Sequence, residues 1–196
     1  MKSLVISLKI FLFFTVLTGL IYPLFVTGIA QLIFPSKANG SLIKKDNIVI
    51  GSTLIGQQFS SAGYFSSRPS AYSYNSLISG GSNYGLTNRK LKDVVAERRK
   101  QFISFNNLDS TTVVPSEMLF ASASGLDPHI SPEAALMQVN RIAKARNFSD
   151  NQKQSLIQTI NELKEPPQFL FLGEERINVL TLNLELDKIG PEITNK

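Results

Sequence analysis

An uninterrupted apolar run from Ile10 to Phe34 constrains this chain of 196 residues more than any other feature. At about 1.5 Å of rise per residue, the run can cross the roughly 30 Å hydrocarbon layer of a membrane as one helix, and it carries no charged side chain. We therefore predict one transmembrane helix ahead of one soluble domain. The expected divisions are a tail over 1–9, the helix over 10–34, a linker over 35–46, the soluble domain over 47–190 and a tail over 191–196.

The alternative interpretation of the apolar run is a cleaved secretory signal. Gly28 and Ala30 are small residues of the kind found before a cleavage site, here after Ala30. The apolar region of a signal is usually about 7 to 15 residues long, and this run is longer, which favours a retained anchor. Pro23 lies near the middle of the run, where it removes one backbone donor, so the helix should kink there or lean on a neighbour.

The charges that flank the run are nearly balanced. Lys2, Lys9 and the terminal amine precede it, and three lysines follow it at positions 37, 44 and 45. A short basic tail usually stays in the cytoplasm, whereas a folded domain can be exported whatever its charge. We predict a single-pass membrane protein with its N-terminus in the cytoplasm and its soluble domain outside.

Composition excludes several classes of site. The chain has no cysteine, so it can form neither disulfides nor zinc-thiolate sites, and its one histidine cannot make a histidine cluster for a metal. The net charge of +5 would suit nucleic acid or anionic lipid, but acidic residues are interspersed with the basic ones. We expect a solvated basic surface, no metal site and no nucleic-acid partner.

The soluble part indicates an α+β domain. Strands are predicted over 47–55, 168–172 and 177–186, and the last of these needs a bulge or two buried faces because its apolar residues change parity. Helices are predicted over 87–105, from Ser131, and over 149–163, each with a capping residue at its start. Arg98 falls on the apolar face of the first helix, so it must either reach a carboxylate or carbonyls or extend along the face to solvent.

Between the first strand and the first helix lie about thirty residues rich in Ser, Gly, Tyr and Asn, with no regular period. Such a long irregular stretch is typically functional, and its aromatic residues could pack it onto the domain. Within it, Ser79-Gly80-Gly81-Ser82-Asn83 could approach an anion, or it could be a plain turn. Gly51 and Gly56 have the spacing of a phosphate-binding loop, but Gln57 stands where the lysine should be.

A serine, an aspartate and the histidine also lie close together in the sequence. Ser122 and Ser124 precede Asp127 and His129, but triad members normally come from separate parts of a fold, and the Gly-x-Ser-x-Gly pattern is absent. A rigid Asp-Pro turn before the helix at Ser131 is favoured over a catalytic group. A membrane-anchored envelope hydrolase using Ser124 or Ser122 with His129, and a nucleotide-binding module, remain the alternative functions.

Several motifs in one order together resemble a known family, the C subunit of the Kdp-type potassium-transporting P-type ATPase (the KdpC family). The similarity extends from the apolar run almost to Asp187. The motifs are Gly51-Ser52 with 54–57, Tyr64-Phe65 with 68–71, 79–83, Ser122 with 124–131, Gln138-Val139 with Arg141, and Gly173-Glu174 with 178–180 and Leu182-Asn183.

The resemblance implies a non-catalytic accessory subunit of a high-affinity potassium import complex. Its partners would be a channel-like subunit that binds potassium and a P-type subunit that hydrolyses ATP, besides membrane lipid. The family is described as a catalytic chaperone that raises ATP affinity, which implies assembly and affinity roles here. No tightly bound cofactor is implied, but ATP shared with the hydrolysing subunit would contact Ser79, Gly80, Gly81, Ser82 and Asn83, a stretch that ends in Asn where the comparable loop of ABC transporters has Gln.

Overall fold

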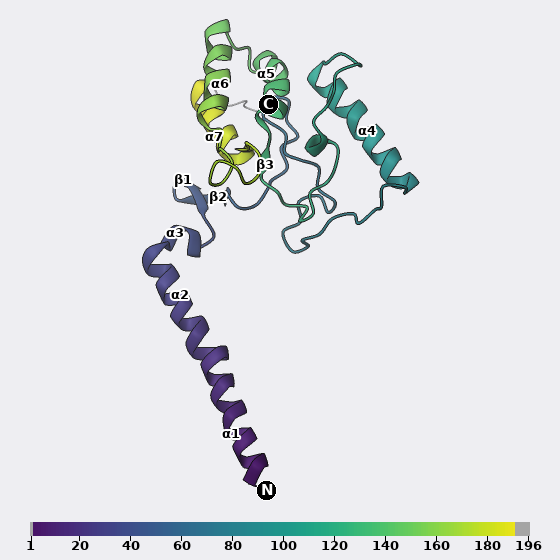
Figure 1. Cartoon of the computed structure of the whole chain (residues 1–196). Helices are drawn as coiled ribbons and strands as arrows, with labels where there is room; N and C mark the ends of the chain where they lie inside the picture. The colour runs from purple at the N-terminus through teal and green to yellow at the C-terminus, as the bar shows by residue number, and fades with distance from the viewer. Residues whose placement is uncertain (1, 191–196) are drawn as a thin grey trace. The chain divides into compact units, whose positions relative to one another are not determined.

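The computed structural model describes residues 2–190. The chain forms two compact units, the first ending at Ser52 and the second beginning at Thr53. The first unit contains the long N-terminal helix and a small β-hairpin. The second contains most of the helices and a second small sheet, so the predicted mixed α+β class is confirmed (Figure 1).

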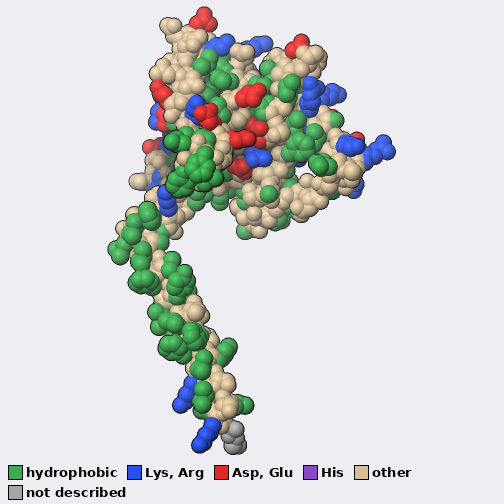
Figure 2. Space-filling view, in the orientation of Figure 1, with side chains coloured by type: hydrophobic (Ala, Val, Ile, Leu, Met, Phe, Trp, Pro, Cys, Tyr) green, Lys and Arg blue, Asp and Glu red, His purple; other side chains and the backbone are tan. Residues whose placement is uncertain are grey.

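The helix of the first unit runs through Lys2–Ile33, as α1 (Lys2–Val16), the π-helical turn η1 (Leu17–Ile21) and α2 (Tyr22–Ile33). It is long and apolar enough to cross a membrane, and none of its side chains in the apolar window is buried within the protein. Figure 2 shows hydrophobic side chains along its whole visible length. The predicted apolar helix is therefore present, and it begins earlier than Ile10.

The π-helical turn η1 directly precedes Pro23. A proline ring collides with the carbonyl group one turn before it, and a widened turn relieves this collision. The backbone N–H of Tyr22 accordingly donates to the carbonyl of Leu17. Hydroxyls near the turn are also satisfied within the helix, because Thr15 donates to Phe11 O at 2.8 Å and Thr18 donates to Phe14 O at 2.7 Å. The disturbance predicted at Pro23 thus takes the form of altered backbone hydrogen bonding.

A short helix α3 (Pro35–Ala38) and an antiparallel hairpin of β1 (Leu42–Lys45) and β2 (Ile48–Ser52) complete the first unit. Asp46 and Asn47 both have positive φ, at 51° and 64°, as a tight two-residue hairpin turn requires. The strand predicted over 47–55 is confirmed in place but ends at Ser52. The residues expected as a linker, 35–46, contain α3 and β1.

The core of the second unit lies among three helices near the end of the chain, where α6 (Asp150–Glu162) packs against both α5 (Pro132–Ala145) and α7 (Val179–Ile189). Large side chains with no exposed surface fill this core, among them Ile142, Leu156, Ile160, Leu182 and Leu186. The elements of this unit are α4 (Arg89–Asn106), the 3-10 turn η2 (Ser116–Met118), β3 (His129–Ile130), α5 (Pro132–Ala145), α6 (Asp150–Glu162), β4 (Ile177–Asn178) and α7 (Val179–Ile189).

The three predicted helices are confirmed at their capping residues. Asn88 accepts a hydrogen bond from the backbone of Lys90 at 2.8 Å, and Ser131 accepts one from Ala134 at 3.1 Å. Ser149 forms a complete capping box with the third residue of α6. Not every position on the predicted stripes is buried, since Leu136 on α5 is 42% exposed.

The predicted strand over 177–186 is wrong beyond its second residue. Only Ile177 and Asn178 form a strand, paired antiparallel with β3, and α7 begins at Val179. Asn178 caps this helix by accepting a hydrogen bond from the backbone of Thr181 at 3.1 Å. The alternating leucines coincide with a helical pattern, because the buried positions 179, 182, 183 and 186 recur at a spacing of three and four residues.

The predicted strand over 168–172 is also wrong. A turn occupies this stretch, with positive φ at Phe169 and Leu170 and a single antiparallel bridge between Gln168 and Leu172. Two bulky residues in the left-handed region cannot continue an extended strand. The four consecutive apolar residues there, 169–172, are exposed and do not form a buried face.

Candidate functional site

The irregular segment after the first hairpin is fixed to the core by side-chain amides rather than by a sheet. Asn183 on α7 accepts from the backbone N–H of Phe65 at 2.8 Å and donates to the carbonyl of the same residue at 3.0 Å. Gln138 on α5 accepts from the backbone N–H of Ser66 at 2.8 Å. Both amide side chains are buried, as is Phe65, so the two bonds to Phe65 satisfy groups that water cannot reach.

Arg141 on α5 is a buried cation among neutral acceptors. It donates to the carbonyl of Ala62, to Asn106 Oδ1 at 2.9 Å and to Gln138 Oε1 at 2.8 Å, and its guanidinium lies 4.4 Å from the ring centre of Phe105. Burial lowers the pKa of Arg141 to about 10. The arginine therefore stays charged at neutral pH and ties the irregular segment to α4 and α5.

Arg146 makes a second attachment at the end of α5. It donates to the carbonyl of Gly63 and to Asp187 Oδ1, both at 2.8 Å, and it lies 4.6 Å from the ring centre of Tyr64. Burial and the neighbouring Asp187 raise the pKa of Tyr64. Residues 62–66 are thus attached by four polar side chains from α5 and α7, none of which the sequence had singled out for this role.

The glycine-rich loop 79–83 lies against the loop 122–125. The backbone N–H of Gly80 donates to the carbonyl of Ser124 at 2.9 Å, and the hydroxyl of Ser79 donates to the same carbonyl at 3.3 Å. Gly125 has a φ of +69°, and a Cβ added there would lie 2.8 Å from the carbonyl oxygen of Gly80. Two motifs more than forty residues apart therefore form one surface, which we call the paired-loop surface (79–83 and 122–125).

The residues predicted to contact ATP, 79–83, form one of the two loops of this surface. Ser79, Ser82 and Asn83 are exposed, whereas Gly80 and Gly81 are half-buried. The loop does not run directly into a helix, because α4 begins at Arg89 and its first turn is capped by Asn88. Asn83 has a φ of 53°, a conformation that Asn adopts more readily than most residues.

Asp127 connects two basic groups beside this surface. Its Oδ2 atom lies 2.5 Å from the guanidinium of Arg68, and its Oδ1 atom accepts from the backbone N–H of His129 at 3.0 Å and lies 3.3 Å from His129 Nδ1. Burial alone would raise the pKa of Asp127, but the hydrogen bonds from His129 and the charge of Arg68 outweigh it and lower that pKa to about 2. These three residues line a cavity of about 450 Å³.

The hydroxyls of Ser122 and Ser124 accept hydrogen bonds from the backbone of the turn that precedes His129. Ser122 Oγ accepts from the backbone N–H of Asp127 at 3.4 Å, and Ser124 Oγ accepts from that of Leu126 at 3.1 Å. Within residues 2–190, no hydrogen bond joins His129 to either serine. The geometry therefore matches the Asp-Pro turn interpretation, and it does not assemble a nucleophile with a general base.

Gly56 shows why the motif 51–56 carries a glycine at its end. Its backbone N–H donates to the carbonyl of Leu126 at 2.8 Å, and a Cβ at this position would lie 2.7 Å from the carbonyl oxygen of Asp127. Asn178 adds a bond to the same region by donating to the carbonyl of Thr53 at 2.8 Å. The glycine permits close backbone contact rather than phosphate binding.

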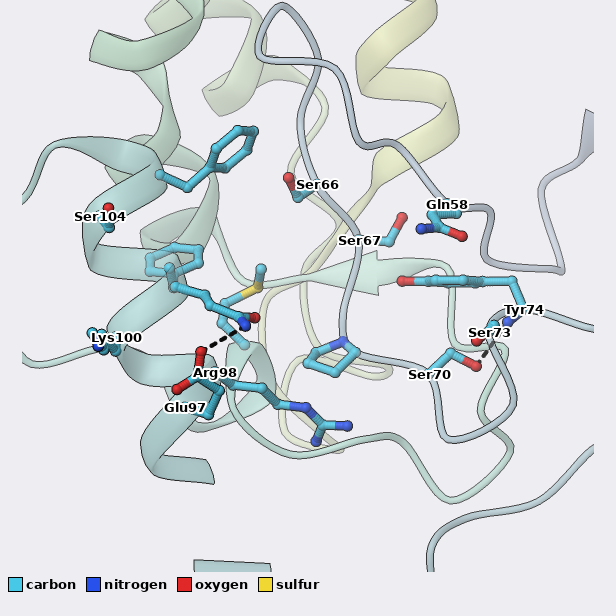
Figure 3. A pocket seen from close by; sticks show the side chains of 15 residues that line it. Gln58, Ser66, Ser67, Ser70, Ser73, Tyr74, Glu97, Arg98, Lys100 and Ser104 are labelled. Carbon is cyan, nitrogen blue, oxygen red and sulfur yellow. Dashed lines mark hydrogen bonds between the residues drawn. The ribbon is translucent and has the colours of Figure 1, made fainter. Parts of the chain in front are cut away.

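A larger cavity of about 720 Å³ separates α4 from the segment 58–74. Arg98 points from α4 toward the segment that carries Ser70 and Tyr74 (Figure 3). Arg98 donates to the carbonyl of Leu119 at 2.9 Å, which confirms the predicted carbonyl partner, and burial lowers its pKa. Burial also raises the pKa of Tyr74 to about 12, and its hydroxyl donates to the carbonyl of Arg68.

The low pKa of Asp127 predicts a specific acid sensitivity. The folded chain stabilises the ionised form of Asp127. The contribution of this carboxylate to stability is therefore present at a pH above its ordinary pKa of 3.8, and it is lost as the pH falls from about 4 to about 2. We expect the unfolding temperature of the full chain to drop more steeply over this range than that of the Asp127→Asn variant. Thermal unfolding followed by circular dichroism at pH 6, 4, 3 and 2 measures both proteins, and parallel curves would contradict the assignment.

Comparison with known proteins identifies the family. The family described as "KdpC: K+-transporting ATPase, c chain" matches residues 4–188. A potassium-transporting ATPase KdpC subunit of Pectobacterium atrosepticum is 47% identical over 194 residues, covering 97% of this chain and 99% of that protein. The KdpC subunit of Mycobacterium bovis strain BCG is 46% identical over 190 residues, with 96% and 99% covered, and that of Geotalea uraniireducens is 47% identical over 194 residues, with 97% and 100% covered. This chain therefore belongs to the KdpC family of potassium-transporting ATPase subunits.

Proposed function

We propose that this chain is a non-catalytic subunit that stabilises the assembly of its potassium-transporting ATPase and raises the affinity of its partners for ATP and potassium. The observation that supports this proposal is that the polar residues of the motifs bond to other parts of the same chain. Asp127 binds both Arg68 and His129, and Gly80 binds the 122–125 loop, so their polar groups build a surface. A surface that is already ordered by its own side chains suits contact with a partner protein better than catalysis.

We further propose two partners in the same complex, a channel-like subunit that binds potassium and a P-type subunit that hydrolyses ATP. The exposed residues Ser79, Ser82 and Asn83 would contact one of them. ATP would bind to the hydrolysing subunit alone. This chain would raise the ATP affinity of that subunit from a separate site, with a coupling free energy of typically about 1–3 kcal/mol. The N-terminal helix would pack against membrane-embedded partner helices.

The proposed location is the bacterial inner membrane, crossed once, with the N-terminus in the cytoplasm and the second unit outside. Under this orientation the second unit is separated from cytoplasmic ATP by the bilayer, which is why the proposed effect on ATP is indirect. The short basic tail with Lys2 and Lys9 supports this orientation.

The orientation predicts that a protease added to intact spheroplasts removes the second unit. An epitope tag at the C-terminus should disappear on immunoblots, and a membrane-protected fragment containing the N-terminal helix should remain. A cytoplasmic marker protein must stay intact as the control. Full protection of the tag, lost only after the membrane is permeabilised, would place the domain in the cytoplasm and reverse the proposal.

Gly80→Ala combined with Gly81→Ala should weaken assembly without unfolding the chain. The added Cβ atoms meet the ring of Tyr72 at 3.3 Å and the backbone of Ala123 and Ser122 at 3.5 and 3.6 Å, so the fold can adjust. We expect the apparent affinity of the chain for its partners to fall about tenfold, which corresponds to about 1.4 kcal/mol. Co-purification with a tagged partner measures this loss.

Gly85→Ala is the matched control, because a Cβ there meets nothing within 4 Å and the position is outside 79–83.

Complexes that contain the Gly80→Ala and Gly81→Ala double variant should still hydrolyse ATP. Normal assembly together with abolished hydrolysis would instead indicate direct nucleotide contact by the loop.

A further inference from the structure

The turn between α6 and β4 exposes four consecutive apolar side chains, which neither the core nor the proposed partner surface uses. Phe169 is 80% exposed, Leu170 86%, Phe171 76% and Leu172 51%. A run of this kind at the tip of a turn is costly in water, since a monomeric soluble surface seldom gathers large apolar side chains in one place. We call residues 169–172 the apolar turn.

The backbone of the apolar turn is unfavourable for the residues it contains. Phe169 and Leu170 have φ values of 52° and 71°, and the N–H of Phe171 closes the turn by donating to the carbonyl of Gln168 at 3.3 Å. Two successive residues with positive φ normally select Asn-Gly, because a bulky side chain is strained there. Strain of this kind persists typically where function requires the side chains.

Charged pairs fix the base of the turn. Glu165 and Arg176 exchange two backbone hydrogen bonds, at 2.8 and 3.1 Å, and their side chains form an ion pair at 3.0 Å. Lys164 and Glu175 form a second pair at 2.9 Å. No charged residue lies from Pro166 to Gly173. The tip is therefore uncharged, and these four charges at its base are neutralised as pairs.

The backbone donors of the tip are almost all satisfied within it. The N–H groups of Gln168 and Leu172 donate to each other's carbonyl at 2.9 Å, and that of Leu170 donates to Pro167 O at 3.1 Å. Pro166 and Pro167 have no N–H group to satisfy. A segment that enters lipid must satisfy its backbone groups internally, and this turn has done so for most of its N–H groups.

We propose that the apolar turn inserts into the interfacial layer of the membrane that holds the N-terminal helix, and so forms a second, reversible contact of this chain with lipid. A shallow apolar contact of this size is weak alone, but an anchor in the same chain keeps it at a high effective concentration near the bilayer. A lipid occupant is favoured over a groove in a protein because the tip offers no charge and few open backbone donors with which a specific partner could pair. The inference goes beyond the proposed function and needs only that the N-terminal helix is anchored, on either side of the membrane.

A single-tryptophan reporter tests this contact. The chain has no tryptophan, so Phe171→Trp gives the full chain one emitter at the tip. In nanodiscs of phosphatidylcholine and phosphatidylglycerol, we expect blue-shifted emission that brominated phosphatidylcholine quenches about twofold and that aqueous iodide quenches little. Leu77→Trp, at an apolar position that is 91% exposed outside the turn, is the control and should be quenched by iodide but not by bromine.

A second variant separates lipid contact from folding. Phe169→Asn with Leu170→Gly, added to the Phe171→Trp chain, replaces the strained residues by those that suit the turn, so the unfolding temperature should be equal or higher. The bromine quenching should fall to the level of the control. Iodide quenching of Phe171→Trp equal to that of Leu77→Trp would overturn the proposal, and so would an emitter shielded from both quenchers, which would indicate a protein occupant.

Discussion

Asn183→Leu is expected to lower the free energy of unfolding by about 3 kcal/mol, although leucine has the same number and branching of side-chain heavy atoms as asparagine. The substitution removes both hydrogen bonds to Phe65, whose backbone N–H and carbonyl then stay buried without these partners. Each such group costs about 1–3 kcal/mol. For a chain of this length the unfolding temperature should fall by roughly 6–12 °C. Thermal unfolding of the purified full chain in detergent measures the shift.

Asn161→Leu is the matched control for this variant. Asn161 is an exposed residue on α6 whose side chain bonds only to its own helix, at Ile157 O. Its replacement should change the unfolding free energy by no more than about 0.5 kcal/mol. Equal stability of the two variants would mean that the irregular segment is not fixed by Asn183, and the attachment described for residues 62–66 would be wrong.

Gly125→Ala is expected to cost at least about 2 kcal/mol and to separate the two loops of the paired-loop surface. An alanine at a φ of +69° costs about 1–2 kcal/mol by itself, and its Cβ would also overlap the carbonyl of Gly80, at 2.8 Å. The strain can be relieved only by moving one loop away from the other. We therefore expect both a lower unfolding temperature and poor co-purification with the partner subunits.

Gly81→Ala tests whether the effect of Gly125→Ala is specific to that geometry. Its Cβ would lie at an ordinary contact distance of 3.5 Å from the carbonyl of Ala123, and its φ is outside the strained range. The stability of this single variant should match the wild type. A Gly125→Ala protein that unfolds at the wild-type temperature and assembles normally would show that close contact between the loops is unnecessary.

The helices that could be predicted from the sequence are those whose caps are local. Ser131 and Ser149 mark their helix starts by side-chain bonds to residues only three positions away, so the sequence contains the whole signal. The failure at α7 lies in its apolar pattern, because its cap at Asn178 is equally local. Its leucines fit both a strand and a helix, and burial against α6, which depends on the assembled fold, favours the helix.

The candidate surface was predictable only in pieces. The glycine loop and the Asp-Pro turn could each be recognised, but their contact through Gly80 and Ser124 joins segments more than forty residues apart. The attachment of residues 62–66 was missed, although Gln138 and Arg141 gave a signal by interrupting the apolar stripe of α5. Polar residues within a stripe indicate buried partners, but the sequence does not say which backbone groups they meet.

The most direct test of the proposed role is to measure potassium-stimulated ATP hydrolysis by the complex purified without this chain and after the purified chain is added back. We expect the isolated chain to hydrolyse no ATP, the complex without it to assemble poorly and to require more ATP, and the added chain to restore assembly and lower the KM for ATP by about 5- to 150-fold. Hydrolysis by the isolated chain, or an unchanged KM and yield when it is omitted, would contradict the account.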